Sequence, residues 1–270
     1  MKILSKYILG SRIGRGYSGS VFNCISQETG IKYACKIVSG EKNVQRNNHE
    51  LHVLKNLKHH NINKIYDVFH DKYRNEPITY IISELAEGDL FDYTKKYIMK
   101  EIKVKKFIRQ ILECIVYLHS KNICHCDLKL ENILYAHDIN KNNEKNYNDI
   151  KLKLIDFEFS KYTHNNKGKR KRLLGRSGTI SFMAPEMLKK KSFSELVDIW
   201  SIGVITYSLL YDTYPIRYTR IEVPDSFEIT YYQRHNVSEN AILFMKELLV
   251  ENPNSRINAK EALQHEWLTI

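Results

Sequence analysis

The first part of the chain alternates short apolar runs with glycine-containing or polar turns. Four runs are rich in β-branched and aromatic residues, and each predicts a strand: residues 7–14, 20–26, 31–38 and 78–84. Residues 47–58 instead place Leu51, Leu54 and Leu57 on one face at helical spacing. We therefore expect residues 1–85 to form a small β-rich lobe with one main helix.

After Gly88 the apolar residues recur at helical spacing. Between residues 101 and 120 one face is apolar, formed by Val104, Ile108, Ile111, Ile115 and Leu118. Residues 194–210 are apolar nearly all round, which predicts a buried helix, and residues 241–250 and 259–268 predict two more. Residues 86–270 should thus form a larger helical lobe, giving an α+β fold of two lobes with a cleft between them.

Two segments of the second part are expected to be exposed loops. Residues 137–149 are rich in asparagine and lysine and have few apolar side chains. Residues 164–177 contain the dense basic run Lys169, Arg170, Lys171 and Arg172.

The bulk composition is that of an ordinary globular protein, with 43% hydrophobic and 27% charged residues. The net charge of +11 favours acidic partners, but charge alone is a weak signal and we do not expect nucleic-acid binding as the main function. The five cysteines lack zinc-site spacing and are expected to be reduced thiols. Without a visible signal peptide or a transmembrane segment, we expect an intracellular monomer in the cytoplasm or nucleus.

A glycine-rich turn and a strand lysine are the first candidates for chemistry. Gly14, Gly16 and Gly19 have the G-x-G-x-x-G spacing, which also occurs in dinucleotide-binding folds, but a strand follows here instead of a helix. Such a hairpin tip can approach phosphates with its backbone. Lys36 follows in a predicted strand, and Glu50 in the predicted helix is its natural partner. Taken singly, each is more simply a surface residue.

The stretch HCDLKLEN, residues 125–132, makes the pattern specific. It stands between the glycine turn and two later motifs, Asp156-Phe157-Glu158 and Ala184-Pro185-Glu186. In this order the set resembles the eukaryotic protein kinases over essentially the whole chain, 7–268. The patterns DIWSIGVITYSLL and EALQHEWL are most similar to the calcium/calmodulin-dependent group. The resemblance also implies that Arg256 pairs with Glu186.

This resemblance implies the roles of the catalytic residues. Asp127 would orient the substrate hydroxyl and accept its proton, while Lys129 would neutralise the γ-phosphate. Lys36, fixed by Glu50, would hold the α- and β-phosphates of ATP. Asn132 and Asp156 would ligate Mg²⁺, which prefers oxygen ligands. Lys129 together with Thr179 is typical of the serine/threonine-specific branch.

The resemblance also implies how ATP and a protein substrate bind. The adenine would lie between Ile13, Val21, Ala34 and Leu134 and would hydrogen-bond the backbone of Glu84 and Ala86. Ser83, small for this position, would open a pocket behind the adenine. Glu131 and Asp89 match positions that bind an arginine three residues before the acceptor in relatives that prefer basic substrates. Alternatively, Glu131 faces solvent and Asp89 binds only the ribose.

The sequence departs from the family at positions that bear on activity. Glu158 replaces a glycine, which would cost roughly 1–2 kcal/mol if the position needs a left-handed backbone. This raises an alternative function, a pseudokinase scaffold that binds nucleotide without transferring phosphate.

Cys126 replaces the arginine that in many kinases binds a phosphorylated activation loop, and the usual phosphate acceptor falls on Gly175. We therefore predict activity without loop phosphorylation. In rival interpretations, phosphorylated Ser177 or Thr179 binds the basic run, or Cys126 is a redox switch.

Overall fold

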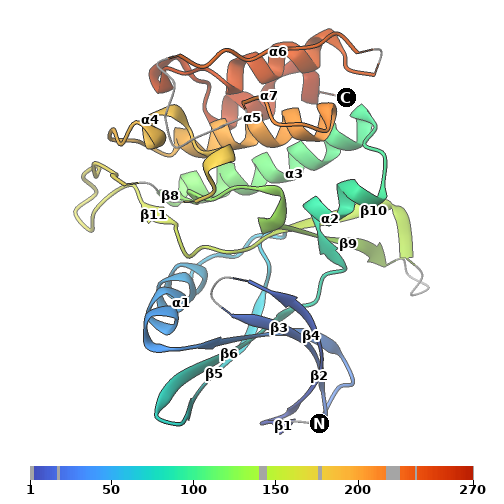
Figure 1. Cartoon of the computed structure of the whole chain (residues 1–270), viewed down its shortest axis with the longest axis vertical. Helices are drawn as coiled ribbons and strands as arrows, with labels where there is room; N and C mark the ends of the chain where they lie inside the picture. The colour runs from blue at the N-terminus through green and yellow to red at the C-terminus, as the bar shows by residue number, and fades with distance from the viewer. Residues whose placement is uncertain are drawn as a thin grey trace. The chain divides into compact units, whose positions relative to one another are not determined.

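The computed structural model describes residues 3–16, 19–139, 145–175, 178–216, 226–234 and 236–269 (Figure 1). The chain forms two compact units, one of Met1–Lys58 with Ile62–Glu87 and one of His59–Asn61 with Gly88–Ile270. The first is rich in strands and the second in helices, so the predicted α+β class is confirmed. The cleft expected between them stays a prediction.

The first unit is built on one antiparallel sheet of six strands in the order β1-β2-β3-β4-β6-β5. The strands are β1 (Ile3–Leu4), β2 (Tyr7–Arg15), β3 (Ser20–Ser26), β4 (Lys32–Ser39), β5 (Ile65–Tyr73) and β6 (Glu76–Glu84). Four of them were predicted, whereas β1 and β5 were missed. The core of this unit consists of Tyr7, Leu9, Cys24, Cys35, Tyr80 and Ile82.

Helix α1 (Glu41–Leu54) packs against β4 and β6 (Figure 1). The predicted bounds, 47–58, were wrong at both ends. Gly40 has φ 85°, a conformation that glycine adopts without steric cost, and the helix begins directly after it. The first turns of α1 are polar and carry no apolar period, so the sequence pattern could not reveal them.

The second unit is mostly helical, and its predicted helices are present. They are α3 (Glu101–Ser120), α5 (Leu196–Tyr211), α6 (Glu239–Leu248) and α7 (Ala259–Gln264). The short helices α2 (Leu90–Lys96) and α4 (Pro185–Leu188) and the 3₁₀ turns η1 (Leu130–Asn132), η2 (Ile180–Phe182), η3 (Pro253–Ser255) and η4 (Glu266–Leu268) were not predicted.

Helices α3 and α5 pack side by side in the centre of this unit (Figure 1). All five residues of the predicted apolar face of α3 are buried. Every residue of α5 is buried except Leu196 and Ser208, as the all-round apolar pattern predicts. One charged residue, Asp198, lies within this buried helix.

Two small sheets carry the loops of the second unit. Strands β7 (Gly88–Asp89), β9 (Ile133–Ile139) and β10 (Lys145–Leu154) form one, and β8 (Ile123–Cys124) pairs with β11 (Lys161–Tyr162) in the other. The strands β9 and β10 extend into 137–149, so the loop predicted there is shorter than expected.

No helix in the described part of the chain is both long and apolar enough to span a membrane.

Candidate active site

The glycine-rich turn joins β2 to β3 in the first unit. Gly14 lies opposite Val21 in the sheet, and the Gly16 N–H donates to the Gly19 carbonyl at 2.8 Å. A Cβ atom on Gly19 would lie 2.2 Å from the Ile37 carbonyl oxygen, so only glycine fits this close approach of two backbones. Ile13, just before the turn, is 50% exposed.

Lys36 and Glu50 form the predicted ion pair. The Lys36 Nζ atom on β4 lies 3.0 Å from Glu50 Oε2 on α1, and Glu50 is buried. Burial of the carboxylate makes this pair less exposed to screening by water than a surface pair. The pair therefore positions the lysine ammonium at a defined place beside β4.

The register of the sheet brings the adenine candidates of the first unit together. Val21 lies opposite Lys36, and Ala34 lies opposite Ser83. Ala34 is buried. Glu84 uses its N–H to donate to the Lys64 carbonyl at 2.9 Å. Ala86 follows β6 within the same unit.

Three groups converge on the Asp127 carboxylate in the second unit. Lys129 Nζ lies 3.0 Å from Oδ2, the Thr179 N–H donates to Oδ1 at 2.9 Å, and Asn132 Nδ2 donates to Oδ2 at 3.1 Å. Lys129 Nζ also donates to the Thr179 hydroxyl at 2.9 Å. The structure thus brings together four predicted site residues from two distant segments.

Gly178 lets the second segment approach this closely. It has φ 96°, and a Cβ atom there would lie 2.7 Å from both Asp127 Oδ1 and the Cys126 carbonyl oxygen. Any other side chain would therefore push Thr179 away from Asp127.

Asp198 anchors residues 125–132, the catalytic loop, and the sequence pattern did not predict this role. Its carboxylate accepts the backbone N–H groups of His125 and Cys126, each at 2.9 Å, and contacts His119 Nε2 at 2.9 Å. Burial by itself raises the pKa of Asp198, but the hydrogen bonds from His119 and His125 outweigh it and hold the pKa below its ordinary value. A lone aspartate in an otherwise apolar helix was the available signal.

His125 ties the loop to the segment before Asp156. Its Nε2 atom lies 3.1 Å from the Ile155 carbonyl, so Nε2 carries the proton, and Nδ1 accepts the Asp127 N–H at 3.3 Å.

Arg256 and Glu186 form the implied buried ion pair, with two bonds of 2.9 and 3.1 Å.

Asp156 has the features of a metal ligand. Its Oδ1 atom is buried and has no hydrogen-bond partner in the part of the chain that the structure describes. A buried carboxylate oxygen without a donor is costly unless a cation binds it. Asn132 lies close by, because its carbonyl accepts the Ile155 N–H at 3.0 Å. One carboxylate and one amide suit Mg²⁺, which takes its remaining ligands from water and phosphate.

The strained backbone position is Asp156 and not Glu158. Asp156 has φ 66°, whereas Glu158 is absent from the positive-φ residues of the described chain. The condition for a conformational cost at Glu158 is therefore not met, and this corrects the concern raised from the sequence.

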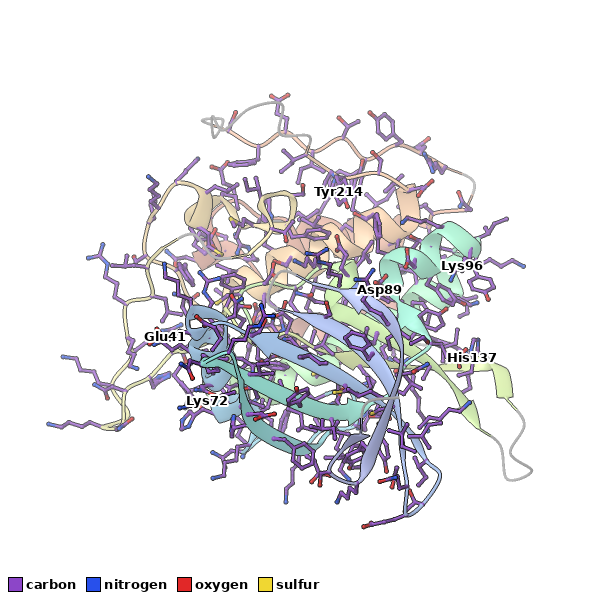
Figure 2. The ribbon with its side chains drawn as sticks, turned by 60° about the horizontal axis from the view of Figure 1, so that its bottom comes forward. Glu41, Lys72, Asp89, Lys96, His137 and Tyr214 are labelled. Carbon is purple, nitrogen blue, oxygen red and sulfur yellow. The ribbon has the colours of Figure 1, made fainter. Side chains whose placement is uncertain are left out.

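Asp89 and Glu131 lie in neighbouring elements, because β7 and α2 both contact η1. Asp89 (Figure 2) caps α2 by accepting the Asp92 N–H at 2.8 Å and lies opposite Leu134 in the sheet. Burial raises the pKa of Asp89. The Glu131 Oε2 atom is buried without a hydrogen-bond partner among the described residues, so this oxygen does not face solvent.

Cys126 and the segment after Glu158 are the positions that bear on regulation by phosphorylation. Cys126 has φ 68° and is buried, and Gly175 has φ 103°. Arg170 of the basic run forms a bidentate pair with Glu195, both bonds at 2.9 Å. Ser177 lies outside the described residues.

The profile of the protein kinase domain family matches residues 7–268, so the chain belongs to this family, as the sequence predicts. Calcium-dependent protein kinase 5 of Plasmodium falciparum is 34% identical over 95% of this chain and 44% of its own length. Death-associated protein kinase 2 of Homo sapiens is 31% identical over 99% of this chain and 73% of its own length.

Myosin light chain kinase 3 of Homo sapiens is 33% identical over 95% of this chain and 30% of its own length. These relatives confirm the predicted resemblance to the calcium/calmodulin-dependent group. The chain spans less than half the length of the Plasmodium protein and of myosin light chain kinase 3.

Proposed function

We propose that this chain is a serine/threonine protein kinase domain that transfers the γ-phosphate of ATP to hydroxyl groups of protein substrates. The observation that carries the proposal is the convergence of Lys129, Asn132 and the Thr179 N–H on the Asp127 carboxylate. Phosphoryl transfer depends on positioning and charge neutralisation, and this arrangement supplies both.

Asp127 is the acceptor of the substrate proton. Three donors orient its two oxygens and hold the carboxylate in one position. Lys129 neutralises the transferred phosphate, and Thr179 orients the lysine through its hydroxyl. Mg²⁺, when bound by Asp156 and Asn132, would neutralise charge on the phosphate oxygens.

The first unit binds ATP in this proposal. Lys36, held by Glu50, contacts the α- and β-phosphates, and the turn of Gly14, Gly16 and Gly19 covers them. Because the Glu84 N–H already donates to Lys64, the Glu84 carbonyl accepts from adenine, and the Ala86 backbone completes the contact. The adenine itself packs on the side chains of Ile13, Val21 and Ala34 of this unit.

The substrate carries a basic residue before its acceptor. The buried Glu131 Oε2 atom has no hydrogen-bond partner among the described residues, and an arginine guanidinium supplies bidentate bonds to carboxylates. Asp89, on the element next to η1, adds a second negative charge.

We further propose that the domain acts as a monomer in the cytoplasm or nucleus.

A Mg²⁺-dependent transfer assay with labelled ATP and an arginine-containing serine peptide tests the proposal. Wild type should phosphorylate the peptide, and Asp127→Asn should abolish transfer while ATP binding stays within about threefold, because residues of the first unit bind the adenine and the α- and β-phosphates in this proposal. Glu228→Ala, an exposed change, is the control and should keep full activity. ATP binding without transfer by the wild type would establish the pseudokinase alternative instead.

A further inference from the structure

Two buried thiols lie next to the proposed proton acceptor. The Cys126 Sγ atom lies 3.3 Å from the Cys124 Sγ atom and 3.7 Å from the Cys124 carbonyl oxygen. Cys124 is 0% exposed and Cys126 is 6% exposed. The sequence pattern suggests a redox switch at Cys126 alone, and one intervening residue is not a usual metal-ligand spacing.

The backbone holds the two side chains together. Cys124 ends β8, and the backbone turns after it so that the two sulfurs lie 3.3 Å apart across the single residue His125. The His125 ring points elsewhere and packs edge-on against Phe157 with centroids 4.9 Å apart. The left-handed φ of 68° at Cys126 and its N–H bond to Asp198 fix the second thiol.

We propose that Cys124 and Cys126 are a redox-active dithiol that a peroxide converts to a disulfide. The sulfur atoms, 3.3 Å apart, would have to approach to a bonding distance of about 2.05 Å by rotation of the two side chains. The inference concerns covalent chemistry of the thiols and holds whether or not the domain transfers phosphate.

The reaction has two balanced steps. The Cys126 sulfur, the more exposed of the two, attacks hydrogen peroxide and forms a sulfenic acid with release of hydroxide, which takes the thiol proton to give water. The Cys124 sulfur then attacks the sulfenic sulfur, and a second water leaves with its proton. In total, two thiols are oxidised and one peroxide is reduced to two waters.

Burial gives the two sulfurs different roles. It raises the pKa of Cys124 well above its ordinary value, with the Cys126 bond and the Asp198 charge adding to the effect. Cys124 therefore remains a thiol and acts as the second, resolving sulfur, at a rate slower than that of a surface thiolate. The intramolecular distance of 3.3 Å offsets this low reactivity.

Peptide mapping tests the proposal on the whole chain. Trypsin releases residues 122–129 as one peptide that contains both cysteines. After treatment with hydrogen peroxide and blocking of remaining thiols, this peptide should lose about 2 Da and resist the blocking reagent until dithiothreitol is added. Cys24→Ser changes another fully buried cysteine and should leave the mass loss intact.

Single variants identify the bond. Cys124→Ser and Cys126→Ser should each abolish the loss of about 2 Da, and Cys124→Ala and Cys126→Ala repeat the test if a serine variant unfolds. A gain of about 16 Da or more on Cys126, or full blocking of both thiols after methionines have oxidised, overturns the proposal.

Activity gives a second and separate measurement. The bond would tie Cys126 to β8 directly before Asp127, so peroxide should remove most phosphotransfer by the wild type and dithiothreitol should restore it. The Cys126→Ser variant should keep its activity in peroxide. If the domain has no transferase activity at all, the proposed function fails, but the peptide mass still decides the dithiol.

Discussion

The Asp198 carboxylate accepts the backbone N–H of Cys126 at 2.9 Å, although the two residues are 72 positions apart in the chain. A second oxygen of the same group accepts the N–H of His125. One side chain of α5 thus fixes the backbone immediately before Asp127, and the geometry of the candidate active site depends on it.

Replacing Asp198 should destabilise the protein strongly. In Asp198→Ala the buried N–H groups of His125 and Cys126 lose their acceptor, and each unpaired group costs about 1–3 kcal/mol. We expect the free energy of unfolding, measured by urea denaturation, to fall by about 3 kcal/mol or more. The exposed Glu228→Ala should change it by less than about 0.5 kcal/mol; equal stability of the two variants would contradict the anchoring role.

The same carboxylate should make stability depend on acid. Because its pKa is lowered in the folded state, the unfolded chain binds the proton more tightly. The stabilisation is fully present above the unfolded pKa of about 3.9 and is lost as the pH falls through the lower folded value. Urea midpoints between pH 6 and pH 3 should fall more steeply for wild type than for Asp198→Asn, which has no group to protonate. If the urea midpoints of the two proteins fall equally with pH, His119 and His125 do not stabilise the charged Asp198 carboxylate.

Glu131 and Asp89 should determine the preference for arginine three residues before the acceptor. Glu131→Gln keeps the shape but removes the charge, and kcat/KM for an arginine peptide should fall by about 10- to 100-fold. Asp89→Asn retains an N-cap for α2, so its effect would report charge and not helix stability. A peptide with alanine at that position is the control. If Glu131→Gln slows both peptides equally, substrate recognition is not its role.

Ser83 should admit adenine mimics with bulky aryl groups. It lies opposite Ala34, so two small side chains face each other across β4 and β6. Ser83→Met should weaken such an inhibitor by at least about tenfold, or 1.4 kcal/mol, while leaving the KM for ATP nearly unchanged. Equal potency on both proteins would mean that other side chains fill this space.

Activity should not require phosphorylation of the activation loop. Cys126 cannot bind phosphate, and the usual acceptor position is Gly175, whose φ of 103° disfavours any larger residue. Phosphatase-treated protein should keep most of its activity, and Cys126→Arg should neither activate it nor create dependence on phosphate. A large loss on dephosphorylation that autophosphorylation of Ser177 restores would refute this prediction.

The sequence by itself determined the features that rest on local patterns. The apolar period of residues 101–120 predicted α3 and its buried face, and the apolar content of residues 194–210 predicted α5. Ordered motifs identified Asp127, Lys129, Asn132 and Asp156 as candidates. These features can be predicted from the sequence because helical spacing and short motifs depend only on neighbouring residues.

Only the tertiary structure decided which distant groups meet. It made Asp198 the anchor of the catalytic loop, placed the left-handed backbone at Asp156 instead of Glu158, and brought the Cys124 and Cys126 sulfurs to 3.3 Å. It also began α1 six residues before the predicted start, after Gly40. A hydrogen bond between residues 72 positions apart cannot be predicted from a local sequence pattern, and neither can a backbone angle that packing determines. Many folded arrangements are compatible with the same local pattern, and only the tertiary contacts select one of them.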